Sequence, residues 1–206
     1  MRRESRDLEA ELCRILMKTG ATKFGLFKLS SGKLSPYYID LRMVPGDPKG
    51  LRTVIQIYER MAKSSIGVGS LDRIAGVPTA GVPYASILAY QITKPFLYVR
   101  GELKPHGGER RVEGQLFPGD RVVLVDDLIT TGKNTLQAAE AIRAEGGQVQ
   151  HVLVLIDRQE GGQAALAQAG LKLCAFTTVS KIASRLRESG VIDDEQYEAI
   201  LAQIAS

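Results

Sequence analysis

RVVLVDDLITTGKNTLQAAE, residues 121–140, is the stretch that decides the fold. It opens with the apolar run Val122–Val125, and a short β-branched run without polar alternation predicts a strand buried on both faces of a parallel sheet. Two carboxylates follow, Asp126 and Asp127, and then a small, hydroxyl-rich turn at residues 130–135. A helix is predicted to begin after the turn. The order is therefore strand, acid pair, phosphate-sized turn, helix N-terminus.

Each part of this order suits one part of a sugar phosphate. A helix N-terminus offers unpaired backbone N–H groups and the positive end of the helix dipole, so it can bind a phosphate. Gly132 lets the backbone approach closely. Asp126 and Asp127 would repel a phosphate beside them, so they must face hydroxyl groups or a metal elsewhere on the ligand. Ligands of open α/β sheets lie at the carboxyl ends of the strands, where this turn is expected.

Two other nucleotide-binding motifs do not match the sequence. A P-loop needs glycine five residues before the Gly-Lys pair and Ser or Thr after it, but Asp127 and Asn134 hold those positions. A Rossmann fingerprint needs G-x-G-x-x-G. The nearest candidate, at residues 67–69, is broken by Asp72.

The stretch resembles the phosphoribosyl pyrophosphate (PRPP) motif of the type I phosphoribosyltransferases, which is an apolar strand, two acids and a Thr/Gly-rich loop. The resemblance implies an α/β fold with a mainly parallel sheet flanked by helices, a small N-terminal hood and a mobile catalytic loop. It also implies that the acids hold the ribose hydroxyls and the loop holds the 5-phosphate. The PRPP-binding residues of the motif would be Asp126, Asp127, Leu128, Ile129, Thr130, Thr131, Gly132, Lys133, Asn134 and Thr135.

Residues 24–42 alternate apolar and polar side chains around a turn, which predicts a β-hairpin or a pair of short strands. This stretch contains Phe27, Leu29, Ser31, Gly32, Ser35, Pro36 and Tyr37, and it is similar to the N-terminal signature of the orotate phosphoribosyltransferase family. In that family a lysine often precedes the Ser-Gly pair, whereas Ser30 stands here. Tyr37 and Tyr38 fall where the family lines its base pocket, and Thr130 would also lie near the base.

A second strand-loop-helix unit is predicted at residues 73–91. Its loop, Pro78–Gly81, offers another helix N-terminus to an anion, and the resemblance implies that it cradles pyrophosphate. Some family members carry a lysine where Ala80 stands.

Residues 101–120 show no periodicity and are rich in glycine and charge, which is typical of an active-site lid. They resemble the catalytic loop of the orotate family through Arg100, Lys104 and His106, with Gly101 in place of a lysine. Cations that close over leaving pyrophosphate stabilise the transition state. The resemblance further implies a homodimer in which this lid acts across the interface.

A further buried strand is predicted at residues 151–156, followed by Asp157 and Arg158. The family places an arginine here against the orotate carboxylate, and a guanidinium suits a planar carboxylate through two parallel hydrogen bonds.

The composition fits one α/β domain over residues 1–206, with a hood segment at 1–45 and C-terminal helices at 178–206. Neither a signal peptide nor a transmembrane run is evident, so a cytoplasmic location and no membrane partner are expected. The net charge of +4 is mild, and no basic stripe with interleaved aromatic residues suggests nucleic acid. Cys13 and Cys174 are expected to be free core thiols.

The resemblance therefore implies an enzyme that joins orotate and PRPP to give orotidine 5'-monophosphate and pyrophosphate in pyrimidine synthesis. Mg²⁺ would bridge the pyrophosphate and the ribose hydroxyls, with no protein residue assigned as a metal ligand. Lys104, His106, Asp126 and Asp127 would be the catalytic residues. Two alternatives stay open: a phosphoribosyltransferase for a purine or uracil, because Ser30, Ala80 and Gly101 replace lysines, and a non-catalytic PRPP-sensing regulator.

Overall fold

The computed structural model describes residues 2–28, 34–101 and 111–205, with the side chains described from Asp7 onward. The chain divides into two compact units. The first comprises Met1–Val54 together with Thr177–Ser206, and the second comprises Ile55–Phe176. Within the described ranges, no helix is both long enough and apolar enough to cross a membrane.

A central sheet dominates the second unit. Among the described residues it has six strands in the order β5-β4-β3-β6-β7-β8. Strands β3, β4, β6 and β7 run parallel, and β5 is antiparallel to β4. The strands are β3 (Arg73–Gly76), β4 (Phe96–Val99), β5 (Val112–Glu113), β6 (Arg121–Ile129), β7 (Gln148–Asp157) and β8 (Lys172–Thr178).

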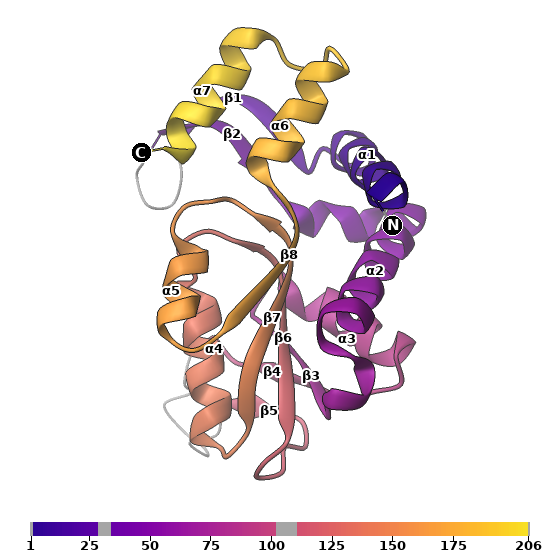
Figure 1. The fold of residues 1–206 in the computed structure, drawn as a ribbon, viewed down its shortest axis with the longest axis vertical. Helices are drawn as coiled ribbons and strands as arrows, with labels where there is room; N and C mark the ends of the chain where they lie inside the picture. The colour runs from indigo at the N-terminus through magenta and orange to yellow at the C-terminus, as the bar shows by residue number, and fades with distance from the viewer. Residues whose placement is uncertain (1, 29–33, 102–110, 206) are drawn as a thin grey trace. The chain divides into compact units, whose positions relative to one another are not determined.

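Helices cover both faces of this sheet, with α3 on one face and α4 and α5 on the other (Figure 1). The bounds are α3 (Gly81–Gln91), α4 (Lys133–Ala144) and α5 (Gly162–Gln168). Apolar residues of α4, such as Ala138 and Ile142, pack with Leu124 and Val154 of the sheet in one buried cluster. The predicted parallel α/β sheet is confirmed.

Both ends of the chain contribute to the first unit. Strands β1 (Thr22–Lys28) and β2 (Leu34–Ile39) form an antiparallel pair, which confirms the predicted hairpin, although its turn lies outside the described residues. Helices α1 (Arg2–Lys18), α6 (Val179–Glu188) and α7 (Asp194–Ile204) complete this unit. Asp193 and Gln196 form a capping box on α7. Helix α2 (Pro48–Met61) begins in the first unit and ends in the second, followed by the π-helical turn η2 (Ala62–Ile66). The 3₁₀ turns are η1 (Leu41–Gly46) and η3 (Val68–Ser70).

Of the predicted lid at residues 101–120, the structure describes residue 101 and residues 111–120. Val112 and Glu113 form β5, and the side chains of Val112 and Leu116 are buried in the sheet cluster. Asp120 accepts a hydrogen bond from the Phe117 backbone at 2.8 Å. The helix α5 was not predicted. The contact of residues 111–120 with the sheet was not evident from their irregular composition, because only a few apolar side chains make that contact.

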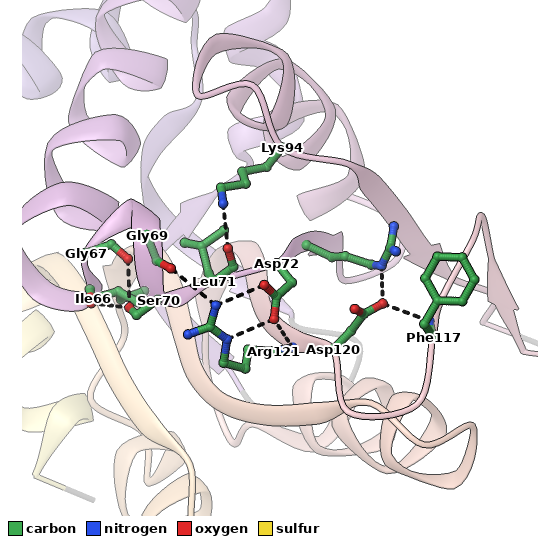
Figure 2. A network of polar contacts seen from close by, with 11 residues as sticks. Ile66, Gly67, Gly69, Ser70, Leu71, Asp72, Lys94, Phe117, Asp120 and Arg121 are labelled. Atoms are coloured by element: carbon green, nitrogen blue, oxygen red, sulfur yellow. Dashed lines mark hydrogen bonds and ion pairs between the residues drawn. The ribbon is translucent and has the colours of Figure 1, made fainter.

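Polar contacts join the beginnings of β3 and β6 at the amino-terminal edge of the sheet (Figure 2). Arg121 donates to both carboxylate oxygens of Asp72, at 2.8 and 2.9 Å, and Lys94 donates to the Leu71 carbonyl at 2.7 Å. Arg73 pairs with Asp120 in a less exposed contact. These contacts hold the two strands in register at the edge opposite the predicted ligand.

Candidate active site

Three loops meet at the carboxyl edge of the sheet, after the neighbouring strands β3, β6 and β7. A Cβ atom added to Gly81 at the start of α3 would lie 2.4 Å from the carbonyl oxygen of Val125 in β6. A Cβ added to Gly162 would lie 2.5 Å from the carbonyl oxygen of Thr130. The loops are therefore in direct backbone contact, and Gly81 is required because any side chain there would collide with the strand that carries the acid pair.

Asp126 and Asp127 lie inside β6, since the strand continues to Ile129. The sequence predicted that they follow the strand. Each is 8% exposed. An Asp126 carboxylate oxygen accepts from the Asp127 backbone N–H at 2.9 Å, and an Asp127 oxygen accepts from Leu128 N–H at 2.8 Å. The strand backbone therefore holds both carboxylates in a fixed direction.

Burial, followed by the neighbouring Asp127 carboxylate, raises the pKa of Asp126 well above its usual range. Two adjacent buried carboxylates cannot both ionise freely. The pair is thus poised to gain negative charge when a cation or a developing positive charge comes close.

The turn after β6 presents the groups that a phosphate needs. Gly132 has φ of +81° and is the N-cap residue of α4, to which it supplies no capping side chain. Thr131, Lys133 and Asn134 are exposed, Thr130 is half-buried and Thr135 is buried. The exposed backbone and side-chain donors of this turn suit an oxyanion.

Leu128 and Ile129 do not belong to this turn. Both lie in β6, and the Ile129 side chain is buried in the apolar cluster. Their contact with PRPP stays a prediction, because the strand is longer than its apolar run and carries both residues to the edge of the turn.

Helix α3 offers a second N-terminus without a side-chain cap in the described structure. By contrast, Thr178 caps α6 and Asp193 caps α7, both in the other unit. Helices usually satisfy their first N–H groups with a capping side chain. The N-cap residues of α3 and α4 supply no capping side chain, and Gly161 at the start of α5 supplies none either, so the first N–H groups of these helices can bind an anion.

Arg158 directly follows β7, at the same edge. Its backbone N–H donates to the Ile129 carbonyl at 2.9 Å, so it stands beside the end of β6. Its guanidinium is buried and lies 2.8 Å from a carboxylate oxygen of Glu160. The sequence analysis did not single out Glu160. Its carboxylate pairs with Arg158, as the orotate carboxylate is expected to do.

The described base of the predicted lid is well anchored. Arg100 pairs with Glu113 of β5 at 3.0 Å. A carboxylate oxygen of Glu145 accepts from the backbone N–H groups of Arg111 and Val112, both at 3.1 Å. Lys104 and His106 lie outside the described residues, and so does Ser30.

Tyr37 and Tyr38 belong to the other compact unit. Tyr37 is 1% exposed and is a core residue of that unit, while Tyr38 is half-buried with its ring 5.9 Å from the ring of Phe27. Their place in a base pocket stays a prediction.

The carboxylates of Asp126 and Asp127 are the candidate oxygen ligands for Mg²⁺ at this edge. Among the described residues, no cluster of three or more His, Cys, Asp or Glu side chains is arranged to hold a metal. Mg²⁺ is commonly held by one or two carboxylates together with substrate phosphates and water. The Asp126–Asp127 pair therefore fits an ion that arrives with a pyrophosphate.

Known proteins resemble this chain over most of its length. A family model for the phosphoribosyl transferase domain matches residues 51–169. An orotate phosphoribosyltransferase of Pyrobaculum aerophilum is 43% identical, over 90% of this chain and 94% of that protein. One from Pyrococcus furiosus is 37% identical, over 85% and 95%. The crystal structure of the orotate phosphoribosyltransferase from Aeropyrum pernix has a TM-score of 0.78 at 37% identity, covering 88% of this chain and 99% of that one.

Proposed function

Because the chain belongs to the orotate phosphoribosyltransferase family, we propose that it transfers the phosphoribosyl group of PRPP to orotate, a step of pyrimidine biosynthesis. The products are orotidine 5'-monophosphate and pyrophosphate. The observation that carries the proposal is the buried acid pair between two helix N-termini without side-chain caps, because this edge matches a ribose with a phosphate at either end.

Each group at the edge has a role in this reaction. The turn at residues 130–135 binds the 5-phosphate, and the loop at 78–81 binds the pyrophosphate. Asp126 and Asp127 hold the ribose hydroxyls. As the bond from the anomeric carbon to pyrophosphate breaks and the bond to the orotate nitrogen forms, positive charge develops on the sugar. The buried carboxylates stabilise that charge strongly because little water screens them.

The remaining assignments rest on the resemblance and on position. Arg158 binds the orotate carboxylate and exchanges its Glu160 partner for the substrate, with Thr130 near the base. The resemblance alone assigns Tyr37 and Tyr38 to the base pocket. Lys104 and His106, with Arg100, neutralise the leaving pyrophosphate from the lid. Asp126 and Asp127 would hold a Mg²⁺ ion that arrives with the pyrophosphate, and the ion would supply positive charge against the leaving group. The enzyme acts as a homodimer whose lid reaches the neighbouring site.

Neither alternative from the sequence has an observation in its favour. The three replaced lysine positions gave the reason to consider a purine or uracil. The orotate relatives match most of this chain: one covers 90% of it and 94% of that protein, and another covers 88% of it and 99% of that one. The same match leaves no ground to prefer a PRPP-sensing regulator.

A base panel tests the proposal. The purified protein is mixed with PRPP, Mg²⁺ and either orotate, hypoxanthine, guanine, adenine or uracil, and pyrophosphate release is followed. We expect release with orotate alone, together with a fall in orotate absorbance. Release with a purine but not orotate would refute the proposed substrate and the role of Arg158.

A further inference from the structure

Tyr58 of α2 is a buried polar side chain that none of the assigned roles uses. It is fully buried, and its hydroxyl donates to the backbone carbonyl oxygen of Asp126 at 2.6 Å. Its ring packs at 5.8 Å, centroid to centroid, against the ring of Tyr84 in α3. A residue 68 positions earlier in the chain thus contacts the backbone of the acid pair itself.

The contact falls on β6 where this strand pairs with β7. The ladder registers Asp126 beside Val154, so the hydroxyl reaches β6 at a level where both strands are paired. Tyr58 therefore contacts the sheet at the level of the two carboxylates.

A phenylalanine would fill the same apolar space, so packing does not explain the hydroxyl. A buried hydroxyl costs free energy unless it is hydrogen-bonded. Here its hydrogen points to the carbonyl of the peptide that joins Asp126 to Asp127. Fixing that carbonyl fixes the peptide plane, and with it the directions in which the two side chains leave the backbone.

We propose that Tyr58 is a positioning residue that sets the orientation of the Asp126–Asp127 pair toward the ribose hydroxyls. This inference rests on the proposed function, because that function gives the pair its ligand. Burial raises the pKa of Tyr58 well above its usual value, so the hydroxyl keeps its proton and remains a donor at every pH of an ordinary assay.

The test compares Tyr58→Phe with Ile142→Val by calorimetric titration of two ligands. Ribose 5-phosphate carries both the phosphate and the ribose hydroxyls, whereas inorganic phosphate reports the phosphate site alone. Ile142 is fully buried near the far end of α4, so removal of one methylene there supplies a matched packing defect away from the acids.

We expect Tyr58→Phe to weaken ribose 5-phosphate binding roughly five- to ten-fold, the net value of one hydrogen bond, with phosphate binding unchanged. Ile142→Val should change neither dissociation constant. In turnover, Tyr58→Phe should lower kcat/KM for PRPP and leave KM for orotate unchanged. Added to the Asp126→Asn/Asp127→Asn double variant, it should have no further effect, because the carboxylates it orients are gone.

An unchanged affinity for ribose 5-phosphate in Tyr58→Phe would overturn the inference. Equal weakening of both ligands would also overturn it, because that result indicates general loosening of the edge. The titrations contain no base. If the wild-type protein binds ribose 5-phosphate but fails to consume orotate, the proposed function fails while the test of Tyr58 still gives its answer.

Discussion

At the scale of single residues, the acid pair is costly to fold. Asp126 is buried beside Asp127, and its pKa is raised by burial first and by that carboxylate second. When the pKa of a carboxyl group is higher in the folded than in the unfolded state, the group stabilises the fold fully below the unfolded pKa of about 4. This stabilisation is lost as the pH rises through the pKa of the folded state. Ionisation of Asp126 therefore lowers the free energy of unfolding as the pH rises toward neutral.

Asp126→Asn should remove the cost. We expect the variant to gain stability relative to wild type as the pH rises from about 4 to about 7.5, because the amide never ionises. Urea unfolding at both values measures the difference in free energy of unfolding. A difference in stability that is constant with pH, or that favours the wild type more at the higher pH, would show that ionisation of Asp126 does not destabilise the fold.

Sequence reasoning could identify these residues but not their surroundings. The run from Val122 to Asp127 has a pattern that depends only on neighbours along the chain. The pairing of Arg158 with Glu160 depends on side-chain conformation, and the contact of Tyr58 with Asp126 spans 68 residues. Distant contacts of this kind leave no local signal.

At the scale of helices and strands, the two edges of the sheet have opposite tasks. The carboxyl edge leaves the N-termini of α3 and α4 without side-chain caps, while the amino edge is fastened by ion pairs (Figure 2). The strand and helix types were largely predictable because the apolar periods are clear. The end of β6 was not, since main-chain pairing with β7 carries the strand through two charged residues.

The fastened edge gives a prediction on stability. Asp120→Ala leaves the poorly exposed Arg73 without its carboxylate and removes the acceptor of the Phe117 N–H. We expect a loss of about 2–4 kcal/mol in the free energy of unfolding. This is slightly less than the roughly 3–5 kcal/mol lost when a fully buried pair is broken, because Asp120 is partly exposed. Asp72→Ala is the matched control, because its pair with Arg121 is more exposed and should matter less.

Denaturant unfolding and steady-state kinetics of both variants check this expectation. KM values for PRPP and orotate should stay at the wild-type level, since the changes lie at the edge away from the site. An Asp72→Ala loss equal to or larger than that of Asp120→Ala would contradict the ranking by burial.

At the scale of the whole molecule, the proposed dimer makes a prediction that one subunit cannot satisfy alone. If the lid acts on the neighbouring site, a Lys104→Ala subunit lacks the cation and an Asp126→Asn/Asp127→Asn subunit lacks the acid pair. Each homodimer should be nearly inactive. A mixed dimer places an intact lid over an intact acid pair, so co-refolding the two variants should restore part of the wild-type turnover.

The control is the same mixing with two samples of one variant, which should restore nothing. Sedimentation should show dimers in every sample. Mixed dimers with no recovered turnover would show that the lid closes over its own subunit. The sequence suggested this arrangement only through resemblance, because a partner chain leaves no pattern that periodicity can read.

We propose that Asp126 and Asp127, between the N-termini of α3 and α4, are the centre of phosphoribosyl transfer to orotate. The most direct measurement is orotate consumption by the wild type and by the Asp126→Asn/Asp127→Asn variant, with thermal unfolding to verify that both are folded. We predict steady turnover by the wild type and a loss of at least about a hundred-fold in the variant, as for removal of a main electrostatic group. A folded variant with near-normal turnover would contradict the account.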